Sequence, residues 1–141
     1  MTMDARSAAI LMDQLGAEHA ELIPWTEKVM DAARNKSPEL GELVARYAGM
    51  LGQPLDSHIV QEDTVLFPAF AQATGDDGLP AQFSEEHREI LALRDDLLAA
   101  HREGAAIADL AAIAAQFADL LNSHMTREDE VLFPSARHAL S

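Results

Sequence analysis

The chain has 141 residues, of which 48% are hydrophobic, and its 24 acidic and 10 basic residues give a formal charge of −14 without any cysteine. This length suits one domain with a buried core, and so acidic a surface excludes nucleic acid and anionic membranes as expected partners. The lack of cysteine excludes disulfides, thiolate nucleophiles and cysteine-held metals, and the lack of a long apolar stretch or signal-peptide pattern favours a soluble cytoplasmic protein.

In the first half of the chain, apolar residues at a helical period predict a helix over residues 7–35. The Ser-Pro-Glu sequence that opens residues 37–73 is typical of a helix start and predicts a second helix there. Pro24 and Pro54 fall inside these two helices, and each is expected to kink or break its helix. Residues 74–78, Thr-Gly-Asp-Asp-Gly, predict the strongest loop of the chain.

In the second half, a third helix is expected to start at Pro80 or Ser84 and to continue to about Arg102. A fourth is expected over residues 106–138, and no window shows the alternation of a β-strand. Four long helices with short connections predict an all-α fold, an up-down-up-down four-helix bundle built from two helical hairpins.

The sequence also contains an internal repeat. Residues 57–68 recur as residues 123–134, 66 positions later, and both copies share Ser-His, Glu-Asp and Val-Leu-Phe-Pro in register. A shorter Glu-His repeat precedes each copy, with an offset of 68. The chain therefore reads as one domain over 1–141 made of two pseudo-repeats, about 7–75 and 79–141. A bend is expected at the proline that ends each copy.

Each repeat supplies one lone histidine and one His-x-x-x-Glu pair. Residues four apart on a helix point the same way, so the pairs offer a nitrogen and an oxygen from one face. Buried carboxylates are costly unless they are paired or bound to metal. The candidate metal ligands are therefore His19, His58, Glu62, His87, His124 and Glu128.

Two alternatives bear on this ligand set. A single His-x-x-x-Glu pair is more often a surface ion pair than a metal site, but two copies in register favour the metal. Asp63 and Asp129 directly follow the two glutamates and could replace them as ligands, although a place outside the ligand set is favoured.

On its Glu-His, His-x-x-x-Glu and Leu-Phe-Pro elements, the chain resembles the hemerythrin-like family, also called the HHE cation-binding domain. The resemblance covers nearly the whole chain and implies a four-helix bundle with two Fe ions in an oxo- or hydroxo-bridged di-iron centre. It makes the four histidines terminal ligands and the two glutamates the bridges. Zn or Mn are possible substitutes for iron at such nitrogen and oxygen ligands.

The resemblance also implies a function. Oxygen carriers of the family have a further histidine where this chain has Leu91, and that side chain is expected to point at the metal held by His87. Each iron is then expected to keep an open position that reacts with or reversibly binds O₂, nitric oxide or peroxide. The alternatives are an oxidoreductase that consumes peroxide or nitric oxide with an external electron donor, and an iron store or donor for iron-centre repair. No catalytic side chain apart from the ligand set is predicted.

Overall fold

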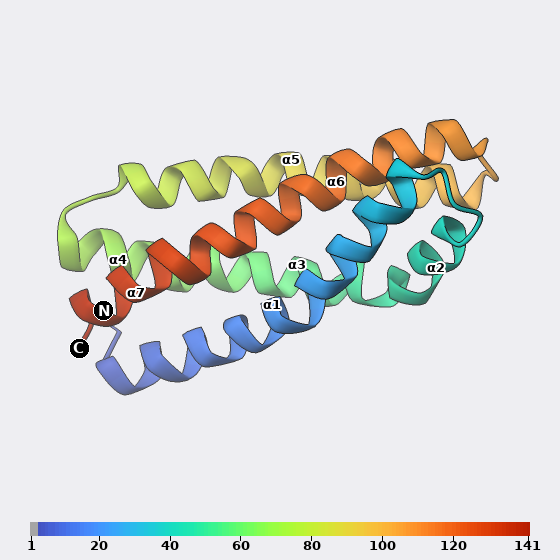
Figure 1. Cartoon of the computed structure of the whole chain (residues 1–141). Coiled ribbons are helices and arrows are strands. Elements are labelled where there is room, and N and C mark those ends of the chain that lie inside the picture. Colours follow the sequence, from blue (N-terminus) through green and yellow to red (C-terminus); the bar gives the residue numbers. More distant parts are fainter. Residues whose placement is uncertain (1–2) are drawn as a thin grey trace.

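The computed structural model describes residues 3–141, and every regular element within that range is helical. The prediction of an all-α fold is confirmed. The helices run side by side along one long axis, and the first and last described residues lie at the same end (Figure 1). This arrangement is compatible with a helical bundle, and the up-down-up-down order of a four-helix bundle stays a prediction.

The first helix, α1 (Ala5–Arg34), continues through Pro24. Its start is capped by the Asp4 carboxylate, which accepts a hydrogen bond from the Ser7 N–H at 2.7 Å. Because proline lacks the N–H that would bond to the preceding turn, a bend without a break is a common result. Figure 1 shows α1 changing direction along its length, so the kink predicted for this helix is present and the break is not.

The second predicted helix is divided into α2 (Leu40–Leu51) and α3 (Gln53–Gln61). Gly52 separates them, and Pro54 lies in the first turn of α3, where a missing N–H costs nothing. The Arg94 side chain reaches across and donates to the Leu51 carbonyl at 2.8 Å, so this carbonyl at the break has a partner. The predicted second helix is therefore broken just before Pro54, and the Arg94 side chain from another helix binds the chain at this break.

Both copies of the repeat contain a wide π-helical turn that the sequence did not predict. These turns are η1 (Glu62–Leu66) and η2 (Glu128–Leu132), and each is followed by a short helix, α4 (Phe67–Thr74) or α7 (Phe133–Ala139). Pro68 and Pro134 lie in the first turn of these helices. At each of these two prolines, where a bend was expected, the structure has a widened π-helical turn just before the proline, and the chain continues as an α-helix after it.

The remaining long helices are α5 (Gly78–Arg102) and α6 (Ile107–Arg127). The predicted loop is present, and α4 ends at Gly75 with a left-handed φ of 75° that glycine adopts without strain. The helix after it begins at Gly78, earlier than both predicted starts. The α6 helix packs extensively against both α1 and α5.

Buried apolar side chains form two cores, one on each side of a buried polar layer. The large core includes Trp25, Val29, Leu51, Ile59, Ile90, Leu97, Phe117 and Leu121, among others. The small core consists of Ala8, Met12, Leu15, Leu66, Phe67, Phe70, Phe83, Leu132, Phe133 and Ala136. Along every helical run that carries them, the six candidate ligands lie between residues of the small core and residues of the large core. The fold therefore holds them in one buried layer.

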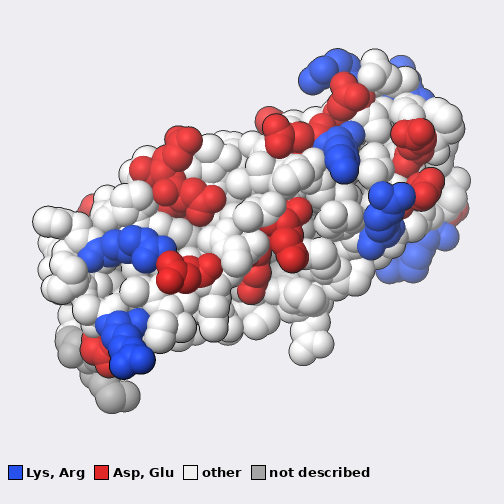
Figure 2. Space-filling model, turned by 60° about the horizontal axis from the view of Figure 1, so that its bottom comes forward, with Lys and Arg blue, Asp and Glu red and all other residues white. Residues whose placement is uncertain are grey.

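The outer surface is mixed in charge. On the face drawn in Figure 2, acidic side chains spread over the length of the molecule, and the basic ones lie mostly toward its two ends. Within residues 3–141, no helix combines the length and the apolar character needed to cross a membrane.

Candidate metal centre

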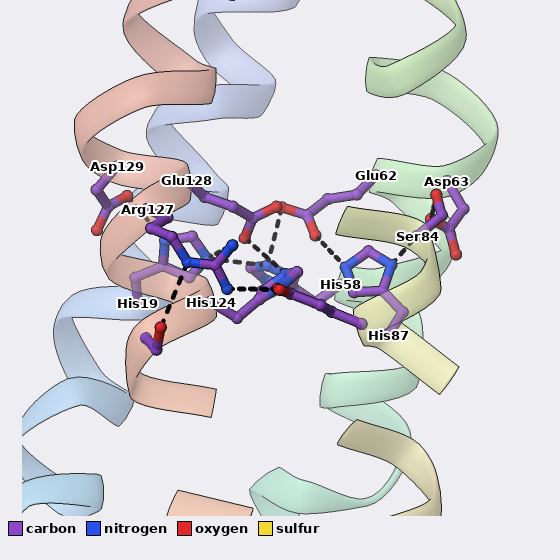
Figure 3. A network of polar contacts seen from close by, with 12 residues as sticks. His19, His58, Glu62, Asp63, Ser84, His87, His124, Arg127, Glu128 and Asp129 are labelled. Carbon is purple, nitrogen blue, oxygen red and sulfur yellow. Dashed lines mark hydrogen bonds and ion pairs between the residues drawn. The ribbon is translucent and has the colours of Figure 1, made fainter. Parts of the chain in front are cut away.

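The six candidate ligands come from four different stretches of helix and meet in the polar layer. The histidines lie on α1, α3, α5 and α6, and each glutamate is the first residue of a π turn. Both glutamates are 0% exposed, and no ligand histidine is more than 6% exposed. Figure 3 shows the Glu62 and Glu128 carboxylates approaching each other from opposite sides with the imidazoles gathered around them.

The four Nε2 atoms face these two carboxylates. His58 and His87 lie 3.4 and 2.9 Å from Glu62 oxygens. The Nε2 atoms of His19 and His124 lie 3.2 and 3.3 Å from the Glu128 Oε1. Two overlapping groups result, each with two histidines and both glutamates, and the ligand atoms within each group lie within 4.8 Å of one another. Because both carboxylates belong to both groups, the geometry suits a pair of ions that share them.

A second set of carboxylates surrounds the histidines. Every ligand imidazole uses its Nδ1 to contact one of them, and the pairs are His19 with Asp129, His58 with Glu18, His87 with Asp63, and His124 with Glu86. Three of these contacts measure 2.8–2.9 Å. Carboxylates in this position fix the tautomer and the orientation of a metal-binding imidazole. The Nε2 atoms are therefore left free to face the centre.

These contacts bear on the alternative ligands. Asp63 and Asp129 bind the outer nitrogens of His87 and His19, on the side of each ring that faces away from the glutamate pair. They therefore lie outside the candidate ligand set, as the sequence favoured.

The sequence did not assign roles to Glu18 and Glu86. Both precede a ligand histidine in the Glu-His repeat, yet each contacts a histidine on another helix. The signal was present, since both acids recur in register, but only the packing shows which histidine each one reaches. Arg127 and Ser84, which donate to Glu86 and Asp63, were also missed.

The protonation of the site follows from these contacts. Burial alone would lower the pKa of His19, but its hydrogen bond with Asp129 and the nearby Glu128 carboxylate outweigh burial and raise this pKa to about 9. In the same way, Glu18 and Glu62 raise the pKa of His58 to about 10 against the effect of burial. Burial would raise the pKa of Glu128, but the nearby His124 and His19 imidazoles lower it. Without metal, protons on His19 and His58 balance part of the charge of the buried carboxylates.

Several buried atoms nevertheless have no hydrogen-bond partner. Within the described residues these are Glu62 Oε2, both Glu128 oxygens and His124 Nε2. Buried polar atoms are rarely left unpaired in proteins, and an ion is one of the accepted explanations. All four atoms belong to the candidate ligand set, and imidazole with carboxylate is a donor set suited to iron, zinc and manganese. The residues present therefore fit a pair of such ions.

A small cavity lies beside Glu62 and the four ligand histidines. Its volume is about 10 Å³, and its walls are ligand side chains together with Leu22, Leu55, Ile59, Ile90, Leu121 and Met125. Ile90 lines it, and Leu91 instead packs half-buried against the large core. The expectation that Leu91 points at the metal is therefore wrong, because the residue three positions after His87 faces the centre in place of the one four positions after it.

The family comparison agrees with this geometry. The family model for the Hemerythrin HHE cation binding domain matches residues 8–136, which is nearly the whole chain. The chain belongs to this hemerythrin HHE family. None of the curated proteins and none of the solved structures matches the chain.

Membership in the hemerythrin HHE family and the buried His/Glu layer lead to the same conclusion. The match includes all six candidate ligands, and the structure brings these six side chains together in two overlapping groups. This member of the family is a non-haem metal-binding protein.

Proposed function

We propose that the protein holds two iron ions and binds or senses O₂, nitric oxide or peroxide at them. One ion would be held by His19 and His58 and the other by His87 and His124. Glu62 and Glu128 would bind both. The observation that carries this proposal is that both carboxylates belong to both ligand groups.

The donor set supports iron. Nitrogen and oxygen donors without sulfur suit iron, and also zinc or manganese, which could replace it. Two imidazoles and two shared carboxylates do not fill the coordination sphere of an iron ion, and an open position for a further ligand follows. Iron bound here would supply the redox chemistry that the side chains themselves lack.

The cavity supports a small ligand. A volume of about 10 Å³ is roughly that of one water-sized particle, so the space among the ligand side chains suits an ion or a very small molecule and has no room for an organic substrate. Its remaining walls are aliphatic or methionine side chains, which exclude further water and suit an uncharged diatomic molecule. These walls belong to the large core, so the cavity is part of the packed interior.

The surrounding side chains support binding or sensing. Both nitrogens of each ligand imidazole face a carboxylate, the inner one a glutamate of the pair and the outer one the second set. No imidazole among the ligands is therefore free to act as a general acid or base. An oxidoreductase that consumes peroxide or nitric oxide remains the alternative, together with an iron store or donor. Net reduction of peroxide or nitric oxide would need an external electron donor, because the chain has no cysteine thiol to supply electrons.

We also propose the remaining context. The helical runs would alternate in direction within one domain made of two pseudo-repeats, and the protein would act in the cytoplasm. The charge of −14 supports partners other than nucleic acid or anionic membranes.

The test is the metal content of protein purified in air from iron-rich medium. We expect about two irons per chain, since there are two ligand groups, and a visible charge-transfer band in the oxidised state. Anaerobic titration of the reduced protein with nitric oxide should change the spectrum and saturate at a fixed ratio of nitric oxide to iron. A protein with one tightly bound zinc and no iron would contradict the proposal. If the protein consumes peroxide over many turnovers when an electron donor is supplied, the oxidoreductase is favoured.

A further inference from the structure

A pocket opens on the surface beside His58. Its volume is about 150 Å³, and its walls include Glu18, Glu21, Leu22, Leu55 and His58. Three of these residues, Leu22, Leu55 and His58, also line the internal cavity among the ligands. A single layer of side chains therefore separates this pocket, here called the Glu18 pocket, from the candidate metal centre.

The side of the centre that faces the Glu18 pocket is also the side nearest to solvent. His58 is 6% exposed, against 1–2% for the other three ligand histidines. The supporting carboxylates differ in the same direction, because the Glu18 side chain is 46% exposed and the Glu86 side chain is 24% exposed.

The corresponding side of the second repeat is covered. Arg127 donates two hydrogen bonds from Nη2 to Glu86, at 2.6 and 2.7 Å. Its guanidinium also lies over the Phe83 ring, 5.4 Å from the centroid. Phe83 in turn packs edge-on against His124, with 5.2 Å between ring centroids. This cluster shields His124 and neutralises the carboxylate that supports it.

The first repeat has no equivalent cluster. In register, Gln61 stands where the second repeat has Arg127, and Leu15 stands where it has Phe83. A neutral amide cannot neutralise Glu18, and an aliphatic side chain offers no aromatic face to a guanidinium. The duplicated ligand set therefore has one covered side and one open side.

The charge of the open side suits a cation. Glu18 and Glu21 both line the Glu18 pocket, and behind it lie the buried Glu62 and Glu128 oxygens that have no hydrogen-bond partner. Clefts lined by one sign of charge raise the local concentration of the opposite charge. On the covered side the charge of Glu86 is already balanced by Arg127.

We propose that the Glu18 pocket is the entrance through which divalent metal ions reach the centre. This inference rests on the proposed metal pair and adds the side of the protein from which the two ions enter. An ion that enters here meets Glu18 and His58 first. It passes on to Glu62 when the Leu22 and Leu55 side chains rotate. The covered side takes no part in loading.

The test follows the uptake of cobalt(II) by metal-free protein through the visible absorption of the bound ion. Glu21→Trp places an indole at the mouth of the pocket. Glu89→Trp is the matched control, because Glu89 occupies the register position of Glu21 in the second repeat and both are exposed. We expect E21W to take up cobalt(II) more slowly with the same final amount, and E89W to follow the native rate. Equal rates of cobalt(II) uptake in E21W and E89W would contradict the proposal that the Glu18 pocket is the entrance.

A second variant separates charge from obstruction. Glu21→Gln keeps the size of the side chain, so it should slow uptake at low ionic strength and match the native rate at high ionic strength, where exposed charges are screened. The two proposals fail differently. Native protein that binds no cobalt(II) and no iron contradicts the metal pair. Native protein that binds both, with no difference between the tryptophan variants, contradicts the entrance alone.

Discussion

The two cores on either side of the metal layer are built differently. The large core draws on long stretches of α1, α5 and α6 and is mainly aliphatic around Trp25 and Phe117. The small core is about half as large in residues and contains four of the five phenylalanines. It also contains the short helices α4 and α7, of eight and seven residues. Helices this short are not stable by themselves in water.

The small core is also the one that stacks on the ligands. Phe133 lies parallel to His19 and Phe67 parallel to His87, with ring centroids 5.5 and 5.7 Å apart and interplanar angles of 10° and 8°. Both phenylalanines directly follow a π turn that begins with a ligand glutamate. We therefore expect the large core to hold the bundle by its own volume and the order of the small core to depend on the metal layer.

The largest effect is expected from removing a shared carboxylate. Glu62→Ala or Glu128→Ala should lose most of the bound metal, because each glutamate would hold both ions, and the metal-free variant should lose about 3–5 kcal/mol, since buried charged imidazoles would be left unpaired. Metal analysis and urea denaturation measure the two effects. Glu130→Gln is the control, because Glu130 is exposed in the same π turn. Equal metal retention in E128A and E130Q would contradict the ligand assignment.

Metal removal from the native protein tests the comparison itself. At a free metal concentration a thousandfold above Kd, bound metal contributes about 4 kcal/mol to stability. Hydrogen exchange should show this loss unevenly. Amides of α4, α7 and the start of α1 should exchange much faster in the metal-free protein, and amides near Trp25 and Phe117 should change little. Uniform acceleration along the chain would show that the two cores unfold as one unit.

The metal-free protein should also become less stable as pH rises. The raised pKa values of His19 and His58, about 9 and 10, mean that protonation stabilises the fold below the unfolded value near 6.5. That stability is lost as pH rises through 9–10. The lowered pKa of Glu128 adds stability above about 4.5 that is lost in acid. Thermal denaturation should therefore show the metal-free protein losing a few kcal/mol between about pH 6.5 and 9, and metal-loaded protein should lose less.

The smallest expected effect is a difference in metal retention between one substitution in the small core and one in the large core. Phe133→Leu and Phe117→Leu are equivalent substitutions in the small and the large core, and each should cost about 1 kcal/mol in the metal-free protein. Only F133L removes a ring that stacks on a ligand. Competition with a chelator should therefore show weaker metal retention in F133L and native retention in F117L. Weaker metal retention in F117L than in F133L would show that the large core, and not the small one, holds the ligand side chains in position.

The sequence alone determined the helical class and predicted the candidate ligand set. Histidine and glutamate four residues apart share a face on any helix, and a duplication repeats that face without reference to the rest of the fold. All six predicted side chains meet in the polar layer. The loop at Gly75 and the break at Pro54 also followed from local backbone chemistry, because proline and glycine act on their own turn.

The tertiary structure decided what depends on distance and on exact helical phase. The π turns before Pro68 and Pro134 shift the phase of the following residues, and helical periodicity is too coarse to detect one extra residue per turn. For the same reason, helical periodicity predicted that Leu91 points at the metal, whereas in the structure Ile90 faces the cavity. Glu18 reaches His58 across 40 residues of sequence, and no local rule pairs them. The two repeats already differ in sequence, because Gln61 and Leu15 stand where the second repeat has Arg127 and Phe83. Only packing places Arg127 and Phe83 over one side of the ligand set and leaves the other side facing a pocket.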